Sequence, residues 1–180
     1  MKRLAAVISV LFALVLAGCG GGDQGHNAQD VSFVQDMLPH HEQAVVMSDL
    51  ALSQAGSAEV KDLATRIKAA QGPEISIMQG WLSAWGEEAT DHGGHDMGSS
   101  GMQGMASDED LGALKAASGT EFDRLFLKDM IAHHEGAVEM AKTEIAKGKL
   151  PAAKTLAQRI TISQEEEIAE MRSLLARVSA

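Results

Sequence analysis

Two pairs of adjacent histidines carry the clearest chemical signal in this 180-residue chain. One methionine stands three residues before each pair, and another stands six residues after it. Imidazole binds copper, zinc, iron and nickel, whereas neutral thioether sulfur selects Cu(I) and similar soft ions. Together they predict a copper site, with zinc or silver as alternatives. The eight candidate ligands are His40, His41, His133, His134, Met37, Met47, Met130 and Met140.

The spacing places these groups on one face of a helix, but not around one ion. At about 100° per residue, Met37, both histidines and Met47 share about one third of the helix circumference. Met47 lies about two turns beyond His40, roughly 10 Å along the axis. One ion therefore cannot contact all four groups of a single helix. The pattern predicts either two layers of sites or a site that another helix completes.

Nearby polar residues could support the histidines. Asp36 and Asp129 stand four residues before the first histidine of each pair, so each carboxylate could hold an imidazole in its metal-binding tautomer. A second set could face the histidines from the following helix, either as outer ligands or as a polar network that fixes helix register. The methionines also have an alternative role as core filler. The second set is Gln71, Glu74, Gln164 and Glu167.

A glycine-rich segment, residues 86–106, adds a second candidate metal site. Core packing does not explain methionines in so polar a segment, and short His-rich tracts are typical of metal binding. The alternative is a low-complexity linker in which these side chains have no role. The glycine content predicts a mobile segment that does not pack on the fold. Its candidate ligands are His92, His95, Met97, Met102 and Met105.

The sequences around the two histidine pairs match each other without a gap. Residues 30–78 align with residues 123–171 at a constant offset of 93 positions, the separation of His40 from His133. Self-similarity over this length indicates an internal duplication. We therefore predict two repeats, residues 30–85 and residues 120–178.

Each repeat predicts a helical hairpin. In the first, apolar residues recur at three- and four-residue spacing from an N-cap at Asp30 through Leu52. Gly56 is suited to end this helix, and Ser57 to cap the next one, which runs to about Trp85. The second repeat predicts helices over about 120–147 and 151–178, with a short helix near 108–117 before them. Two hairpins predict an all-α fold, an antiparallel four-helix bundle.

The first 18 residues have the order of a secretory signal. Lys2 and Arg3 precede an apolar run that is too short to span a membrane, and small residues then lead to Cys19. This ending resembles the bacterial lipobox, which implies cleavage before Cys19 and a lipid on its thiol. An ordinary signal followed by a coincidental cysteine is the alternative. We predict an exported protein of the cell envelope, lipid-anchored through Cys19, with residues 19–29 as a tether and residues 30–180 as the bundle.

The charge and the cysteine content limit the classes of partner and ligand that the protein can have. Removing Lys2 and Arg3 takes the formal charge from −10 to −12, which argues against nucleic acid and against electrostatic docking to anionic lipid. Cys19 is the only cysteine, so the bundle has neither a disulfide nor a thiolate ligand. The predicted partners are a metal ion and, through the lipid anchor alone, a membrane. The sequence identifies no protein partner.

The doubled motif resembles the bacterial domain-of-unknown-function family 305 (DUF 305). The family pattern, Phe-x-x-x-Met-x-x-His-His-x-x-Ala-x-x-Met followed by Gln-x-x-Glu-Ile-x-x-Met, is met from Phe33 to Met78 and again from Phe126 to Met171. The resemblance implies a ferritin-like helical fold and an exported location, and some members of the family are linked to copper binding and resistance. Pro39 departs from the residue usual before the histidines, and it is expected to distort the first site relative to the second.

Three functions fit these features. The favoured one is a non-enzymatic copper-binding lipoprotein of the envelope, which sequesters the ion, confers resistance or hands the ion on. A ferritin-like di-iron enzyme is less favoured, because such enzymes use Glu-x-x-His pairs, and here Met37 and Met130 occupy the glutamate position. A metal-free interaction module of the envelope is the third. Because protons compete with metal for imidazole, a histidine site predicts that Cu(I) affinity falls below about pH 6.

Overall fold

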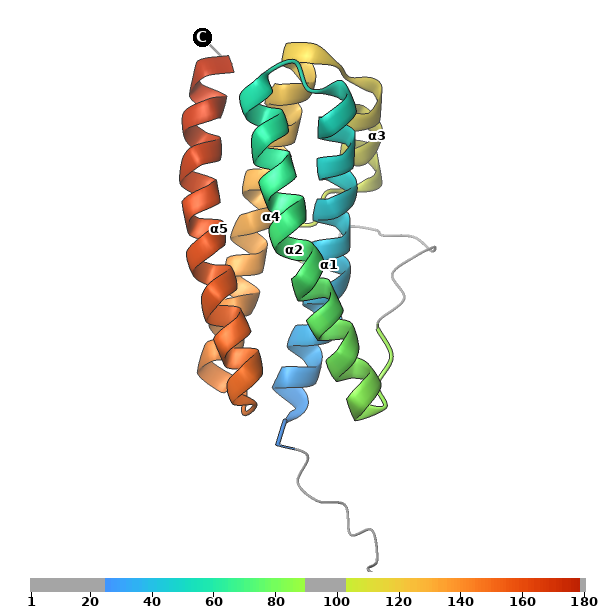
Figure 1. Ribbon diagram of the computed structural model, residues 1–180, viewed down its shortest axis with the longest axis vertical. Coiled ribbons are helices and arrows are strands. Elements are labelled where there is room, and N and C mark those ends of the chain that lie inside the picture. The colour runs from blue at the N-terminus through green and yellow to red at the C-terminus, as the bar shows by residue number, and fades with distance from the viewer. Residues whose placement is uncertain (1–24, 90–102, 179–180) are drawn as a thin grey trace, which may run out of the picture.

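The computed structural model describes residues 25–89 and 103–178, and it confirms an all-α fold. Four long helices are joined by tight turns or by one longer connection that contains a short fifth helix (Figure 1). Cys19, His92, His95, Met97 and Met102 lie outside the described residues. The helices are α1 (Ala28–Gln54), α2 (Ala58–Trp85), α3 (Asp108–Ala116), α4 (Gly119–Lys147) and α5 (Pro151–Val178).

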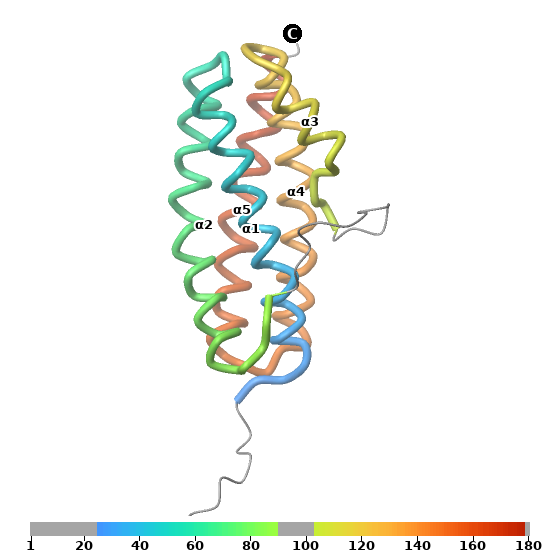
Figure 2. Tube along the Cα trace, turned by 90° about the vertical axis from the view of Figure 1, so that its right-hand side faces the viewer, coloured from blue at the N-terminus to red at the C-terminus, as the bar shows by residue number. Residues whose placement is uncertain are grey.

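The long helices form an antiparallel four-helix bundle made of two hairpins. Figure 1 shows the chain running up α1, down α2, down α4 and up α5, so that α1 and α4 also lie antiparallel. The hairpin α1–α2 packs on the hairpin α4–α5 mainly through α1 and α4, whereas α2 and α5 make few contacts. The connection from α2 to α4 therefore crosses the length of the bundle, and α3 packs on the side formed by α4 and α1 (Figure 2).

The N-cap of the first helix lies three residues before the predicted one. Asn27, not Asp30, is the N-cap: its side chain accepts hydrogen bonds from the backbone N–H groups of Gln29 and Asp30. Asp30 completes a capping box by accepting from the backbone N–H of Asn27 at 2.6 Å. Ser57 caps α2 as predicted, because its hydroxyl accepts from the backbone N–H of Val60.

Two buried aspartates tie each hairpin turn to the other hairpin. Asp123 accepts from the backbone N–H groups of Gly56 and Ser57, both at 2.9 Å. At the opposite end of the bundle, Asp30 accepts from the equivalent groups of Lys149 and Leu150. These bonds satisfy backbone donors at the start of α2 and α5, which have no partner inside their own helices.

Gly56 serves the fold differently from the prediction. A Cβ atom at this position would lie 2.8 Å from the backbone carbon of Gly119. The chain therefore requires glycine here because two backbones meet, and the helix itself ends at Ala55 in an extended conformation.

The interior consists of two apolar clusters with a polar layer between them. The upper cluster surrounds the α1–α2 turn and includes Met47, Leu63, Phe126 and Met130. The lower cluster lies toward the start of α1 and includes Phe33, Met37, Met78 and Leu156. Both histidine pairs fall where the chain passes from one cluster to the other.

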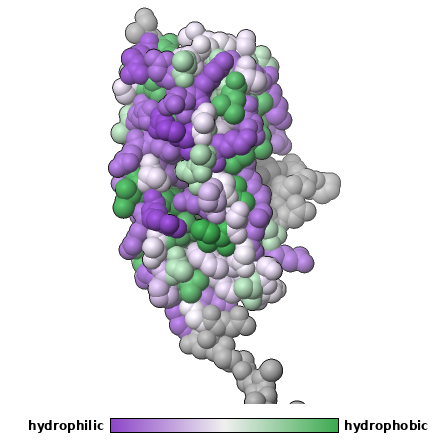
Figure 3. Space-filling view, viewed as in Figure 1, coloured by the Kyte–Doolittle hydropathy of each residue, from purple (hydrophilic) through white to green (hydrophobic). Residues whose placement is uncertain are grey.

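Polar side chains cover most of the outer surface. Figure 3 shows a largely hydrophilic face on which apolar residues are scattered. In the part of the chain that the structure describes, the large apolar side chains that are exposed are Val46, Leu52, Ile77 and Ile162. None of the described helices is long and apolar enough to cross a membrane.

Candidate metal centre

The four predicted histidines meet in the middle of the bundle and are fully buried. His40 and His41 come from α1, and His133 and His134 from α4. The rings of His40 and His133 lie against each other, with centroids 3.7 Å apart and planes inclined by 39°. The spacing allows either two layers of sites or one site that another helix completes. The histidines have the second arrangement, because α1 and α4 each contribute one pair.

The second histidine of each pair is held by a glutamate on the neighbouring helix. His41 Nε2 lies 2.8 Å from the carboxylate of Glu74 on α2. His134 Nε2 lies 2.7 Å from the carboxylate of Glu167 on α5. The prediction that this second set faces the histidines is correct for the glutamates. The two distances match, so Pro39, which lies within α1, does not disturb this contact.

Five imidazole nitrogens in the layer are buried without a hydrogen-bond partner among the described residues. A neutral imidazole carries one donor and one acceptor nitrogen, and leaving such a group unpaired in the interior is unfavourable. His40 Nε2 lies 3.3 Å from the backbone oxygen of Gln103. A carbonyl can only accept, so His40 Nε2 carries the proton and Nδ1 keeps a free electron pair. The unpaired nitrogens are Nδ1 of His40, His41, His133 and His134 and Nε2 of His133.

Burial keeps the central pair in its neutral, metal-binding form. Burial, followed by the neighbouring His41, lowers the pKa of His40 to about 3. Burial, followed by the nearby His40, holds the pKa of His133 well below its usual range. Both rings are therefore uncharged at neutral pH, as coordination requires.

Two glutamines add further buried polar atoms. Gln71 and Gln164 are almost fully buried, one helical turn before Glu74 and Glu167. The amide nitrogen and oxygen of Gln71, and the amide oxygen of Gln164, have no partner within the described part of the chain.

The methionines lie on both sides of the histidine layer, inside the apolar clusters. Met47 and Met130 belong to the upper cluster, whereas Met37 belongs to the lower cluster and Met140, which is partly buried, packs against it. Each cluster thus receives one methionine from α1 and one from α4. This arrangement fits core packing, and it leaves thioethers in the clusters on either side of the imidazole layer.

The predicted aspartates and the one described loop ligand lie in other surroundings. Asp36 accepts a hydrogen bond from Ser32 at 3.4 Å. Burial, then the negative charge of Asp110, raises the pKa of Asp129 to about 6. Met105 is partly buried at the end of the connection. The last residues of the predicted linker, Gln103–Ala106, contact α1 and α4, so the prediction that the whole segment is unpacked is wrong for them.

The carbonyl of Gln103 is the contact to the layer that sequence reasoning missed. A backbone oxygen has no sequence signal, so only the adjacent glycines could have hinted at a close approach. Within residues 25–89 and 103–178, no group of three or more histidine, cysteine, aspartate or glutamate side chains is arranged to hold a metal ion. The layer therefore offers imidazole pairs and thioethers rather than a cage of hard ligands.

Comparison with known proteins identifies the family. The family model described as "Domain of unknown function (DUF305)" matches residues 30–175. The chain belongs to the DUF305 family. This match covers both hairpins and the connection between them, and it confirms the resemblance seen in the doubled motif.

Solved structures of DUF305 proteins share the fold. One, from Streptomyces coelicolor and described as a candidate secreted protein, is 35% identical with a TM-score of 0.76, covering 84% of this chain and 93% of that one. CopM in its Cu(II)-bound form is 35% identical with a TM-score of 0.72, covering 82% of this chain and 96% of that one. CopM has also been solved in Cu(I)-bound, Ag-bound and apo forms.

A curated relative matches a smaller part of the chain. An uncharacterized protein of Acanthamoeba polyphaga mimivirus is 45% identical over 53 residues, which is 29% of this chain and 35% of that protein. The match thus spans about a third of the length of this relative.

Proposed function

We propose that this DUF305 protein is an exported lipoprotein of the cell envelope that binds Cu(I) in the histidine layer and sequesters the ion or hands it on. The observation that carries the proposal is the set of buried, unpaired imidazole nitrogens at the centre of the bundle. The 35% identity with CopM, which has been solved with copper and with silver, supports it.

The donor set favours a soft monovalent ion. His40 and His133 face each other from two helices, and thioethers lie in the clusters on either side. Structural Zn²⁺ sites take four ligands from cysteine, histidine or carboxylates, and the described layer lacks such a group. Cu(I) and Ag(I) accept fewer ligands, thioethers among them.

Each ligand has an assigned role in this proposal. His40 and His133 bind the ion directly, and His41 and His134, each held by Glu74 or Glu167, lie beside them in the layer. Met37 and Met130, about one turn before His40 and His133, complete the coordination after small shifts of their flexible side chains. Met47 and Met140 lie about two turns beyond these histidines and provide further thioethers in the two clusters. The linker residues His92, His95, Met97, Met102 and Met105 form a second set of candidate metal ligands.

Export and anchoring rest on the N-terminal signal and on Cys19, and one substitution tests them. Cys19→Ser should release the protein from the membrane fraction or block its processing. Finding the Cys19→Ser protein in membranes at the normal mature size would refute the anchor.

Metal affinity of layer variants tests the site. The full chain carrying Cys19→Ser, which lacks the only thiol, is titrated with Cu(I) and Ag(I) against a competing chelator. His40→Gln combined with His133→Gln should weaken tight binding by on the order of a hundredfold, since even second-shell partners of a ligand contribute about 10–100-fold.

The matched control is His26→Gln, because His26 stacks on Trp85 outside the layer. This variant should bind both ions like its parent. Unchanged affinity in the double layer variant, or an equal loss in His26→Gln, would contradict the proposal.

A further inference from the structure

The histidine pair is fully enclosed, so an ion can reach it only if something covering it moves. On one side of α1 and α4 the cover is not a helix but a short irregular segment, Gln103–Ala106, which we name the strap. The backbone oxygen of Gln103, its first residue, lies 3.3 Å from His40 Nε2. The strap therefore contacts the candidate ligand directly.

Gln43 on α1 fastens the far end of the strap. Its side-chain amide donates to the backbone oxygen of Ala106 at 2.9 Å, and its side-chain oxygen accepts from the backbone N–H of Ala106 at 2.8 Å. These two bonds reproduce the pairing that a neighbouring strand would provide. A single substitution at Gln43 removes both bonds without changing a histidine.

Two glycines allow the near end of the strap to lie directly on α4. A Cβ atom on Gly136 would stand 1.9 Å from the backbone oxygen of Gln103, and one on Gly104 would stand 2.5 Å from the backbone oxygen of Ala132. Gly104 also has a positive φ of 87°, which favours glycine. Any side chain at Gly136 would push the strap away from the helix.

Two positions that contact the strap are among those at which the matching hairpins differ. At the offset of 93 positions, Gln43, which bonds the strap, corresponds to Gly136, on which the strap lies. Pro39 corresponds to Ala132. The histidines, by contrast, are the same in both hairpins. The strap thus breaks the near symmetry of the layer, since His40 has a carbonyl partner and His133 Nε2 has none within the described residues.

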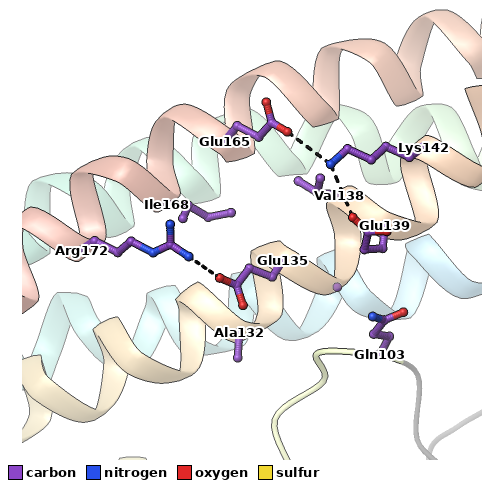
Figure 4. Close-up of a pocket in the computed structure, with 10 residues that line it drawn as sticks. Gln103, Ala132, Glu135, Val138, Glu139, Lys142, Glu165, Ile168 and Arg172 are labelled. Carbon is purple, nitrogen blue, oxygen red and sulfur yellow. Dashed lines mark hydrogen bonds and ion pairs between the residues drawn. The ribbon is translucent and has the colours of Figure 1, made fainter.

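A surface hollow of about 580 Å³ adjoins the strap, and Gln103 and Gly136 both line it. Figure 4 shows Gln103 below α4, and on the other side of that helix two ion-paired groups: Arg172 with Glu135, and Lys142 with Glu139 and Glu165. Because the strap borders open space, it can leave α4 without separating the long helices.

We propose that the strap is a cover that controls access to His40 and His133, and that Gln43 holds it closed. Releasing it breaks a few hydrogen bonds that each contribute modestly to stability, whereas opening the bundle would expose two apolar clusters. Only the identity of the entering ion, Cu(I) or Ag(I), rests on the proposed function.

Chemical modification of the metal-free protein tests the cover. Diethyl pyrocarbonate reacts with accessible neutral imidazole, and peptide mass spectrometry gives the rate at each histidine. Gln43→Ala should raise the rate at His40 about tenfold, as expected for losing two hydrogen bonds. Gly136→Ala, which displaces the strap by steric clash, should act in the same direction.

Selectivity distinguishes opening of the cover from unfolding. His41 and His134 should still be modified slowly in both variants. The control is Gln35→Ala, which removes a hydrogen bond from α1 to the backbone of Glu88 and should leave the modification of His40 slow. An unchanged rate at His40, or an equal increase at all four buried histidines, would overturn the proposal.

A second experiment measures the rate of Ag(I) uptake by stopped flow. Gln43→Ala should load about tenfold faster than the parent if the cover limits entry, and equal loading rates would overturn this step. A protein that binds no Ag(I) would refute the proposed function, while the modification rates would still decide whether the strap is a cover.

Discussion

Buried neutral histidines predict that acid weakens the metal-free fold, and His40 allows the size of the effect to be calculated. Its pKa in the folded protein is about 3, against an ordinary value of 6.5. Between these values the unfolded chain binds a proton at this residue and the native protein does not. Stability is therefore unaffected above about pH 6.5 and decreases as the pH falls toward 3.

The expected loss is large enough to measure. Each pH unit below the unfolded pKa costs about 1.4 kcal/mol, so the contribution of His40 at about pH 5 is about 2 kcal/mol. With a typical urea dependence of about 1–3 kcal/mol per molar, this corresponds to a shift of roughly 1–2 M in the unfolding midpoint.

Other groups titrate over the same range, so the effect must be obtained by subtraction. Burial, together with the adjacent Asp30, raises the pKa of Glu144 to about 8, and this shift has the opposite sign because the native state then holds the extra proton. His40→Gln removes the contribution of His40 and, with it, the smaller effect of His40 on the pKa of His133. Between about pH 7 and pH 5, the wild type should lose about 2 kcal/mol more stability than this variant.

The assay is urea unfolding followed by circular dichroism in the presence of a chelator. Gln71→Met, an uncharged substitution in the same buried layer, is the matched control and should keep the pH dependence of the wild type. If the free-energy difference between the wild type and His40→Gln is the same at both pH values, His40 is not a buried neutral histidine, and the account of the layer fails.

Three further predictions concern metal binding and packing. The sequence predicts that affinity falls below about pH 6, but the depressed pKa of His40 moves proton competition to lower pH. A chelator titration should therefore show Ag(I) affinity nearly constant from about pH 7 to pH 5; a steep fall near pH 6 would contradict this. Changing Met37, Met47, Met130 and Met140 together to Leu should retain the fold, with a loss of stability below about 1.5 kcal/mol per site. The affinity for Cu(I) should fall more than the affinity for Zn(II); an unchanged Cu(I) affinity would mean that the methionines only pack the core. Gly56→Ala should destabilise the protein by about 1–3 kcal/mol because its Cβ meets Gly119. Gly80→Ala, in open space within α2, should stabilise it by about 0.5–1 kcal/mol in urea unfolding; equal effects would refute the steric argument.

The sequence predicted those features that depend on local pattern. Helical periodicity and the offset of 93 positions gave the four long helices, and the spacing of Met37, His40 and Met47 placed them on one helical face. The pairing of His41 with Glu74 was accessible because both halves of a hairpin are close in the chain. Local rules suffice for such contacts.

Other features depend on how the hairpins pack, and sequence pattern does not specify this. The contact between His40 and His133 requires α1 and α4 to cross at the level of the histidines. Asp30 was assigned as an N-cap, whereas its carboxylate also binds the backbone of Lys149 and Leu150 in the other hairpin. The carbonyl of Gln103 belongs to the backbone and leaves no trace in residue type.

The differences between the two hairpins carry information that the matching positions do not. Ala51 in α1 corresponds to Glu144 in α4, and only the second hairpin therefore has a buried carboxyl group beside Asp30. Likewise, Gln43 and Gly136 differ because the strap crosses one of them and lies on the other. Once the fold is known, such departures indicate where a matched pair of hairpins has acquired separate roles.

The central claim is that imidazole nitrogens of the buried layer bind the metal, and histidine ring NMR tests it most directly. Long-range proton–nitrogen correlation spectra of the full Cys19→Ser chain would be recorded while Ag(I) or Cu(I), both diamagnetic, is added. The account predicts that His40 initially shows a protonated Nε2 and a free Nδ1, and that the first equivalent of metal shifts ring nitrogens of His40 and His133 while those of His26 stay unchanged. Shifts confined to His26, His92 and His95, with the layer unaltered, would contradict it.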